Sequence, residues 1–202
     1  MTGLPQGDSP GLLNSSYTIT ADIEVPKGGA EGMILTSGGR FAGYGFYLLE
    51  GKPVFLWNLL NLKRIKWEGA EALPPGRHSV EFDFKYDGLG AGTLSYNNMS
   101  GLGQSGTGTL KVNGKVVDSK KMKHTLPIIL QWDEAFDVGS DTLTGVNDAD
   151  YKPPFVLTAK LNKLTIKVDR PQLSEDEVKK LENTQAIAVD GNPIHHVQGG
   201  PH

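Results

Sequence analysis

The clearest structural signal in the chain is the segment RHSVEFDFKY at residues 77–86. From Val80 to Tyr86 its apolar residues recur at every second position, with polar residues between them. Because successive side chains of a β-strand point to opposite faces, this alternation predicts a half-buried strand. The segment YTITADIEV at residues 17–25 has the same period of two. Both segments therefore favour an antiparallel sheet with one face on the core and the other in solvent.

Other apolar runs predict further strands, and glycine-containing turns separate them. Asn113-Gly114 is the strongest hairpin signal, because both turn residues must accept a positive φ. About ten short strands without alternating helices predict an all-β fold, an antiparallel two-sheet sandwich of jelly-roll type, with a closed barrel as the alternative. The runs lie at residues 32–36, 46–49, 53–57, 62–67, 110–117 and 155–168.

The same patterns predict the domain organisation. Residues 1–13 are glycine, proline and polar residues with little periodicity, and we expect a loose leader there. Residues 14–169 form the sandwich domain. Ser174-Glu-Asp-Glu177 matches a capping box, which predicts a short C-terminal helix within residues 170–185. Residues 186–202 have no period and are expected to be a flexible tail.

The composition argues against several classes of function. The chain has 202 residues, with 20 basic and 23 acidic side chains and a net charge of −3, too balanced for a general nucleic-acid binder. It contains no cysteine, which removes disulfides, thiolate metal sites and cysteine nucleophiles. No apolar run is long enough to insert into a membrane, and the N-terminus shows no signal peptide. The sequence does not indicate the cellular compartment.

The turn Gly38-Gly-Arg-Phe41 carries candidate recognition residues. Arg40 can make a two-pronged contact to a carboxylate or sulfate, and Phe41 can anchor the ligand beside it. Tyr44 and Trp132 are further aromatic candidates. On the outer face of a sandwich an aromatic ring can stack on a sugar or anchor a protein, whereas on the inner face it belongs to the core.

Residues 133–150 are acidic and contain no lysine or arginine. Calcium takes six to eight oxygen ligands, and a loop at a sandwich edge can supply several. The hypothesis is a calcium site, with a solvated acidic loop as the alternative, and no other cofactor is expected. The spacing does not match an EF-hand. The expected ligands are Asp133, Asp141, Asp148 and Asp150.

Two other patterns suggest chemistry. The string GLGQSG at residues 101–106 matches a dinucleotide-binding fingerprint, but the next residues predict a strand where that fold requires a helix. Glu81 and Asp83 share one strand face, as do the carboxylates of laminarinase-like glycosidases, but Tyr86 stands where those enzymes have a second glutamate. A solvated polar face is the simpler interpretation of Glu81 and Asp83.

An ordered series of short pieces between about Asn14 and Val168 resembles the C-terminal region of large bacterial arylsulfatases. The pieces are GGAEGMI at 28–34, GGRFAGYGFY at 38–47, EGKPV at 50–54, LPPGRH at 73–78, DVGSD at 137–141 and DYKPPF at 150–155. The resemblance implies a concanavalin A-like or laminin-G-like sandwich appended to a catalytic domain. The family's nucleophile lies in a C/S-x-P-x-R string, which this chain lacks.

The resemblance therefore implies a non-catalytic accessory domain that docks on a sulfatase catalytic domain or shapes its substrate access. The alternative is an independent lectin-like module that binds a carbohydrate or a protein. A glycosidase on a laminarinase-like sandwich is the third reading. The expected partner is a sulfatase catalytic domain or a glycan.

Overall fold

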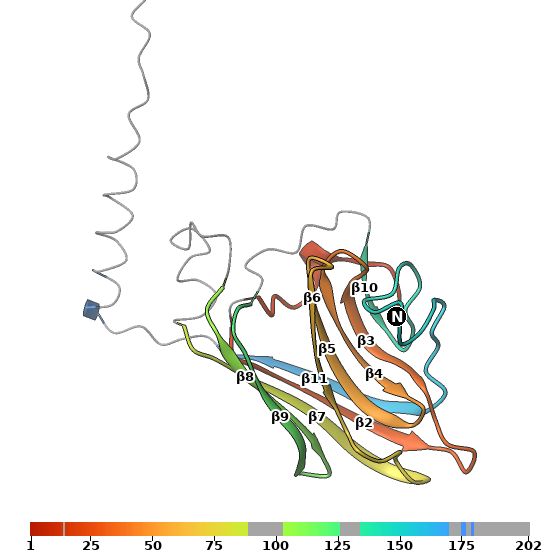
Figure 1. Ribbon diagram of the computed structural model, residues 1–202. Coiled ribbons are helices and arrows are strands. Elements are labelled where there is room, and N and C mark those ends of the chain that lie inside the picture. The colour runs from red at the N-terminus through yellow and green to blue at the C-terminus, as the bar shows by residue number, and fades with distance from the viewer. Residues whose placement is uncertain (14, 89–102, 126–133, 170–174, 177–178, 180–202) are drawn as a thin grey trace, which may run out of the picture. The chain divides into compact units, whose positions relative to one another are not determined.

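The computed structural model describes residues 1–13, 15–88, 103–125, 134–169, 175, 176 and 179 (Figure 1). The chain divides into two compact units, Met1–Arg170 and Pro171–His202. In the second unit Glu175, Asp176 and Lys179 are helical. The rest of the predicted helix and the whole of the predicted tail lie outside the described residues. No described helix is both long and apolar enough to cross a membrane.

Two antiparallel sheets make up the first unit, which confirms the predicted sandwich (Figure 1). Within the described residues, sheet A has six strands in the order β1 (Leu4–Pro5), β10 (Ala135–Val138), β3 (Gly32–Gly38), β4 (Gly43–Leu49), β5 (Lys52–Leu59) and β6 (Lys63–Glu68). Sheet B has five strands in the order β11 (Lys160–Val168), β2 (Tyr17–Val25), β7 (Gly76–Tyr86), β8 (Gly106–Val112) and β9 (Lys115–Met122). A short 3-10 helix, η1, spans Gln6–Asp8.

One face of sheet B is buried and the other contacts solvent, as the alternating segments predict. Every second residue of β2 is buried, and the residues between are half-buried. On the polar face the Thr18 hydroxyl donates to Asp83 at 2.9 Å. The Thr20 hydroxyl donates to Glu81 at 3.2 Å, and Lys111 pairs with Glu81 at 2.9 Å. Glu81 and Asp83, the two carboxylates that suggested a glycosidase, therefore belong to a row of polar side chains that pair across neighbouring strands, here called the polar ladder.

The central strands of sheet A, β3 to β5, are buried on both faces, and their sequences are largely apolar runs. Its inner face packs against sheet B. Its outer face carries a second apolar cluster, which the segment 146–155 covers. Strand residues Met33, Tyr47, Val54 and Leu56 and the covering residues Val146 and Tyr151 form this cluster, with Phe155 packed against it.

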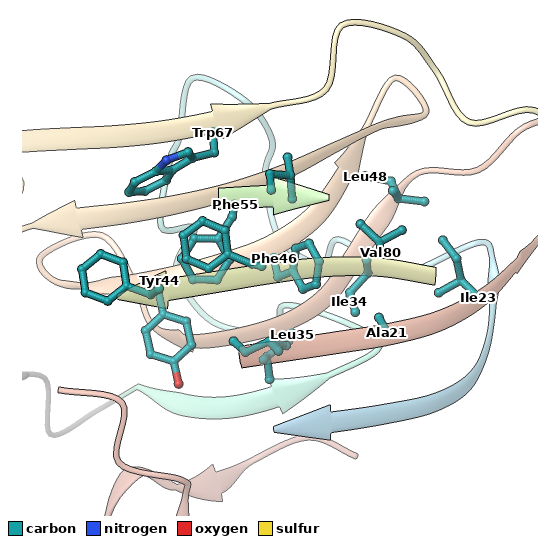
Figure 2. Packing of buried hydrophobic residues seen from close by; sticks show 14 of the residues in the cluster. Ala21, Ile23, Ile34, Leu35, Tyr44, Phe46, Leu48, Phe55, Trp67 and Val80 are labelled. Atoms are coloured by element: carbon teal, nitrogen blue, oxygen red, sulfur yellow. The ribbon is translucent and has the colours of Figure 1, made fainter. Parts of the chain in front are cut away.

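Aromatic rings join the two sheets in the main core (Figure 2). The rings of Phe55 in sheet A and Phe82 in sheet B stack at 3.6 Å between centroids, with an interplanar angle of 7°. The Trp57 indole N–H donates to the Tyr17 hydroxyl at 3.0 Å across the same interface. Trp57 is thus a core residue, as expected for an aromatic in an apolar run.

The first five residues of the predicted leader, residues 1–13, make contacts with sheet A. Leu4–Pro5 pairs with β10, and the Met1 amino group donates to the Val138 carbonyl at 3.1 Å. The Gly3 N–H donates to Asp137 Oδ1 at 2.6 Å. The edge of β10 has backbone N–H and C=O groups without a strand partner, and residues 1–5 supply hydrogen bonds to them. A two-residue strand is too short to leave a periodic pattern in the sequence.

Candidate functional site

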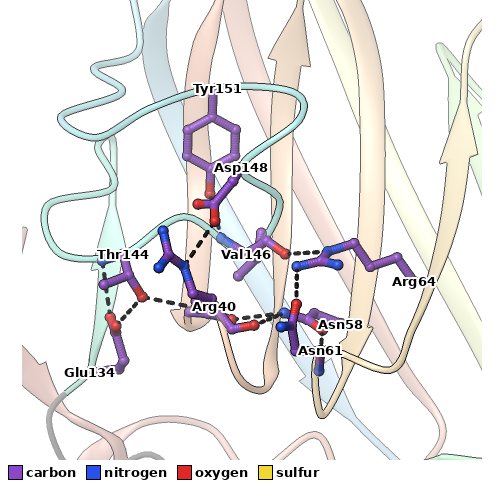
Figure 3. Close-up of polar contacts among 10 residues, drawn as sticks. Arg40, Asn58, Asn61, Arg64, Glu134, Thr144, Val146, Asp148 and Tyr151 are labelled. Atoms are coloured by element: carbon purple, nitrogen blue, oxygen red, sulfur yellow. Dashed lines mark hydrogen bonds and ion pairs between the residues drawn. The ribbon is translucent and has the colours of Figure 1, made fainter.

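At one end of sheet A, the β3–β4 turn and the β5–β6 turn lie next to each other (Figure 3). The β3–β4 turn is closed by Gly38 and Gly43, with φ of 78° and 148°. A Cβ on Gly38 would lie 2.2 Å from the Ala42 carbonyl oxygen, and one on Gly43 would lie 2.2 Å from that of Ser37. Both positions therefore need glycine, and the turn presents Arg40 and Phe41 to solvent.

Asn58, which is 0% exposed, holds the two turns together. Its side-chain amide donates to the carbonyls of Gly39 at 3.0 Å and Arg40 at 2.6 Å. Its amide oxygen accepts the N–H of Asn61 at 3.0 Å. A buried amide with all these partners fixes the backbone on both sides of it. The position of Arg40 is therefore set by β5.

The loop after β10 is attached to these turns by polar contacts (Figure 3). Arg40 Nε pairs with Asp148 Oδ2 at 2.8 Å, and the Arg40 N–H donates to the Thr144 hydroxyl at 3.0 Å. Arg64 Nε donates to the Val146 carbonyl at 3.1 Å. The Thr144 hydroxyl also donates to the Glu134 carboxylate. The loop and both turns therefore form one connected surface.

We call the exposed part of this assembly the turn surface and define it by Arg40, Phe41, Asn61, Arg64 and Asp148. Phe41 is 62% exposed, a large fraction for an aromatic ring. The Arg40 and Asp148 side chains are 52% and 45% exposed. Arg40 pairs with Asp148 through Nε, and no other described residue contacts its terminal nitrogens, which are therefore available as donors within the described part of the chain. The surface combines an apolar ring with hydrogen-bonding groups of both kinds.

The predicted recognition residues differ in their exposure to solvent. Arg40 and Phe41 are exposed on one turn, as expected for recognition residues. Tyr44 is only 2% exposed and packs 4.9 Å from the Trp57 ring, so it faces the core and presents no ring to a ligand. It lies on a strand whose two faces are both buried. Trp132 lies outside the described residues.

The predicted calcium ligands have separate partners. Asp141 accepts the Tyr151 hydroxyl, Asp148 pairs with Arg40, and Asp150 pairs with Lys66 at 3.1 Å. Among the residues that the structure describes, no group of three or more His, Cys, Asp or Glu side chains is placed to hold a metal ion. Asp133 lies outside them. The geometry does not support the predicted calcium site.

Asp141 is a buried carboxyl of the loop with a raised pKa. Its side chain is 2% exposed. Burial, the largest cause, raises the pKa of Asp141 to about 6 against the opposing hydrogen bond from Tyr151, and the Glu134 and Asp137 carboxylates contribute to the rise. Burial likewise raises the pKa of the Tyr151 hydroxyl well above its usual range. Asp141 and Tyr151 are therefore interior groups that hold the loop, beneath the turn surface.

Sequence reasoning did not identify Asn58, Asn61, Arg64 or Thr144. For Asn58 a weak signal exists, because it is a polar residue at the end of an apolar run directly before a turn. Arg64 lies on β6, and its partner Val146 lies on a distant loop, so no local pattern connects them. Contacts between distant segments build most of this site.

No protein-family model matches the chain, and none of the curated proteins matches it. Solved structures do share its fold. Domains LG4-5 of the mouse laminin alpha1 chain are 16% identical, with a TM-score of 0.54 over 86% of this chain and 41% of that chain. The chain thus spans less than half of that laminin structure. The CBM40 domain of the Ruminococcus gnavus IT-sialidase, bound to alpha2,6 sialyllactose, is 14% identical, with a TM-score of 0.50 over 89% of this chain and 91% of that one.

At these identities the comparisons establish the fold alone, a jelly-roll β-sandwich of the laminin G and CBM type. They give no support to the resemblance to arylsulfatases.

Proposed function

We propose that the chain is a non-catalytic, lectin-like module that binds a glycan through the turn surface. The observation that carries the proposal is the exposed Phe41 ring on the same turn as Arg40, which pairs with Asp148, with Asn58 holding this turn in place. Recognition residues commonly lie on loops that a rigid scaffold positions. We therefore prefer the independent lectin-like module, the alternative from the sequence, to an accessory domain that docks on a sulfatase.

A sugar matches the chemistry of this surface. The C–H face of a pyranose ring can pack on an aromatic ring, while its hydroxyls need donors and acceptors close by. Phe41 offers the ring, the terminal nitrogens of Arg40 are donors, and Asp148 is an acceptor. Arg40 also favours a carboxylate or sulfate on the sugar, since charge-assisted hydrogen bonds are the stronger kind. We therefore expect acidic oligosaccharides to bind more tightly than neutral ones.

The connected turns favour binding in a second way. A surface that is already ordered loses little conformational entropy when a ligand binds. The contacts of Asn58 and Thr144 order the backbone of Arg40 before any ligand arrives. The CBM40 domain with a similar fold, solved with sialyllactose, supports the choice of an acidic sugar as the first probe.

Calorimetric titration with 6′-sialyllactose and with lactose tests the proposal. We expect sialyllactose to bind and lactose to bind more weakly. Phe41→Ala should weaken both by about tenfold, as for a central aromatic contact. Arg40→Gln should remove most of the preference for the acidic sugar. Val116→Ala, at a 52% exposed position of β9, is the matched control and should change nothing. Equal binding by wild type, Phe41→Ala and Arg40→Gln would refute the role of the turn surface.

Docking on a sulfatase catalytic domain and a glycosidase activity of Glu81 and Asp83 stay predictions from the sequence. In the structure Glu81 is paired with Lys111, and Asp83 accepts from Thr18. These contacts do not favour a catalytic role over the polar ladder of sheet B.

A further inference from the structure

A pocket of about 180 Å³ opens where an edge of sheet A approaches an edge of sheet B. It lies between the β5–β6 turn and residues 123–125, which follow β9. Strands β6 and β9 are the edge strands of their sheets, and Lys120 Nζ donates to the Lys66 carbonyl at 2.8 Å across the gap. The side chains of Leu59, Leu60, Leu62 and Ile65 give the pocket an apolar lining.

The β5–β6 turn has a leucine at a positive φ and two leucines exposed to solvent. The Leu62 N–H donates to the Leu59 carbonyl at 3.0 Å, and the two residues between, Leu60 and Asn61, have φ of 55° and 57°. Turns of this kind usually carry Asn-Gly, because a bulky side chain at positive φ is strained. Leu60 is nevertheless 38% exposed and Leu62 is 88% exposed. Core packing alone does not account for leucine at these positions.

Two lysines and a histidine lie at this apolar lining. Lys63, Lys123 and His124 line the pocket and are exposed, and their side chains make no ion pair or hydrogen bond within the described part of the chain. Three other lysines on the same two sheet edges are paired, whereas Lys115 at the β8–β9 turn has no ion pair within the described residues. Lys66 pairs with Asp150 and Glu68, Lys120 with Asp118, and Lys121 with Asp87. The positive charge at the pocket therefore has no counterpart among the described side chains.

We propose that this pocket binds a small anionic amphiphile, an aromatic or short alkyl group that carries a sulfate or carboxylate. The apolar group would contact the leucines, and the anionic head would lie between Lys63 and Lys123. A dry cavity of about 150 Å³ accommodates a benzene ring, so this pocket has room for a ring or a chain of about six to eight carbons. The proposed ligand differs from the glycan of the turn surface, because the apolar lining cannot satisfy sugar hydroxyls.

Three octyl compounds with different heads separate the contributions of chain and charge. The full chain is titrated with octyl sulfate, octyl glucoside and octyltrimethylammonium below their micelle-forming concentrations, with amide NMR shifts as the readout. We expect octyl sulfate to shift Leu60, Leu62 and His124 and to bind about three- to tenfold more tightly than the glucoside. The cationic compound should bind most weakly. Equal affinity for all three heads, or shifts confined to other regions, would overturn the proposal.

Two variants and one control connect the effect to the pocket. The double variant Lys63→Gln, Lys123→Gln should bind octyl sulfate no better than octyl glucoside, with glucoside binding unchanged. Leu62→Ser, at an exposed position that should leave the fold intact, should weaken both ligands at least about threefold.

The matched control, Lys115→Gln with Val116→Ser on the β8–β9 hairpin, removes one exposed lysine and one exposed apolar side chain and should change neither affinity. If the control weakens octyl sulfate as much as the Lys63, Lys123 variant does, the binding is non-specific and the proposal is wrong. None of these outcomes depends on sialyllactose binding at the turn surface.

Discussion

At the scale of single residues, the ring of Phe82 shows what joins the two sheets. It is 0% exposed, stacks on Phe55 and lies 5.0 Å from the Trp67 ring. Truncating a buried aromatic leaves a cavity in a close-packed interior. We expect Phe82→Ala to lower the free energy of unfolding by about 3–5 kcal/mol in urea melts. Asp83→Ala, on the half-exposed face, should cost about 0.5 kcal/mol. Similar costs for both would mean that the assignment of the two faces is wrong.

Asp141 predicts a dependence of stability on pH. Its pKa is raised from 3.8 to about 6 in the folded protein, so between these pH values the folded state binds a proton that the unfolded state has lost. The contribution of this carboxyl to stability must therefore fall as pH rises from about 4 to about 6. Asp141→Asn keeps an oxygen that can accept the Tyr151 hydroxyl and cannot ionise.

We expect the stability of Asp141→Asn relative to wild type to increase between pH 4 and pH 7, by up to about 3 kcal/mol. Urea unfolding at both pH values measures it. Taking the difference between the two proteins removes the contributions of the other carboxyl groups. A difference that stays constant with pH would show that Asp141 ionises normally in the folded protein.

At the scale of elements, the strands of sheet A depend on the segment that covers them. Gly45 lies beneath this segment, and a Cβ there would lie 2.8 Å from Val146 Cγ2. We expect Gly45→Ala to cost about 1–3 kcal/mol through overpacking and to speed amide hydrogen exchange in residues 144–151. Gly28→Ala is the control, because a Cβ on Gly28 meets nothing within 4 Å. Normal exchange in Gly45→Ala would indicate that the segment does not pack on this face.

The β5–β6 turn connects stability with the proposed pocket. Leu60 has a φ of 55°, which asparagine tolerates better than leucine does. We expect Leu60→Asn to raise the free energy of unfolding by up to about 1 kcal/mol and at the same time to weaken octyl sulfate binding. Thermal melts and NMR titration measure the two effects. A variant that loses stability and keeps its affinity would contradict both parts of this expectation.

The elements differ in how well their sequence predicts them. The strands β2 and β7 alternate, because one face of sheet B is wet, and period-two reasoning finds them. In β3 to β5 both faces are buried, so the apolar runs predict strands but not which way each side chain points. For this reason Tyr44 could not be assigned to the core from its sequence. In β11 the register shifts between Leu161 and Lys163, where Asn162 interrupts the apolar pattern of the run at 155–168.

At the scale of the whole molecule, the sandwich is a rigid support for two surfaces of different chemistry. The turn surface combines Phe41 with the Arg40–Asp148 pair, and the pocket combines leucines with unpaired lysines. The sequence predicts Arg40 and Phe41 as recognition residues, because exposed polar and aromatic turn residues have a local signal, and it predicts Asp148 only as a calcium ligand. Sequence reasoning could not join Arg40 to Asp148 or find Asn58, because the β-sandwich brings together segments that are far apart in the chain.

Amide NMR shifts during titration with 6′-sialyllactose show directly whether the turn surface binds a glycan. We predict that the shifts concentrate at Arg40, Phe41, Asn61, Arg64 and Asp148 and that Phe41→Ala requires about tenfold more ligand to produce them. Shifts centred on the polar face of sheet B, around Thr18 and Glu81, would contradict the account, as would a saturating titration that leaves the turn surface unchanged.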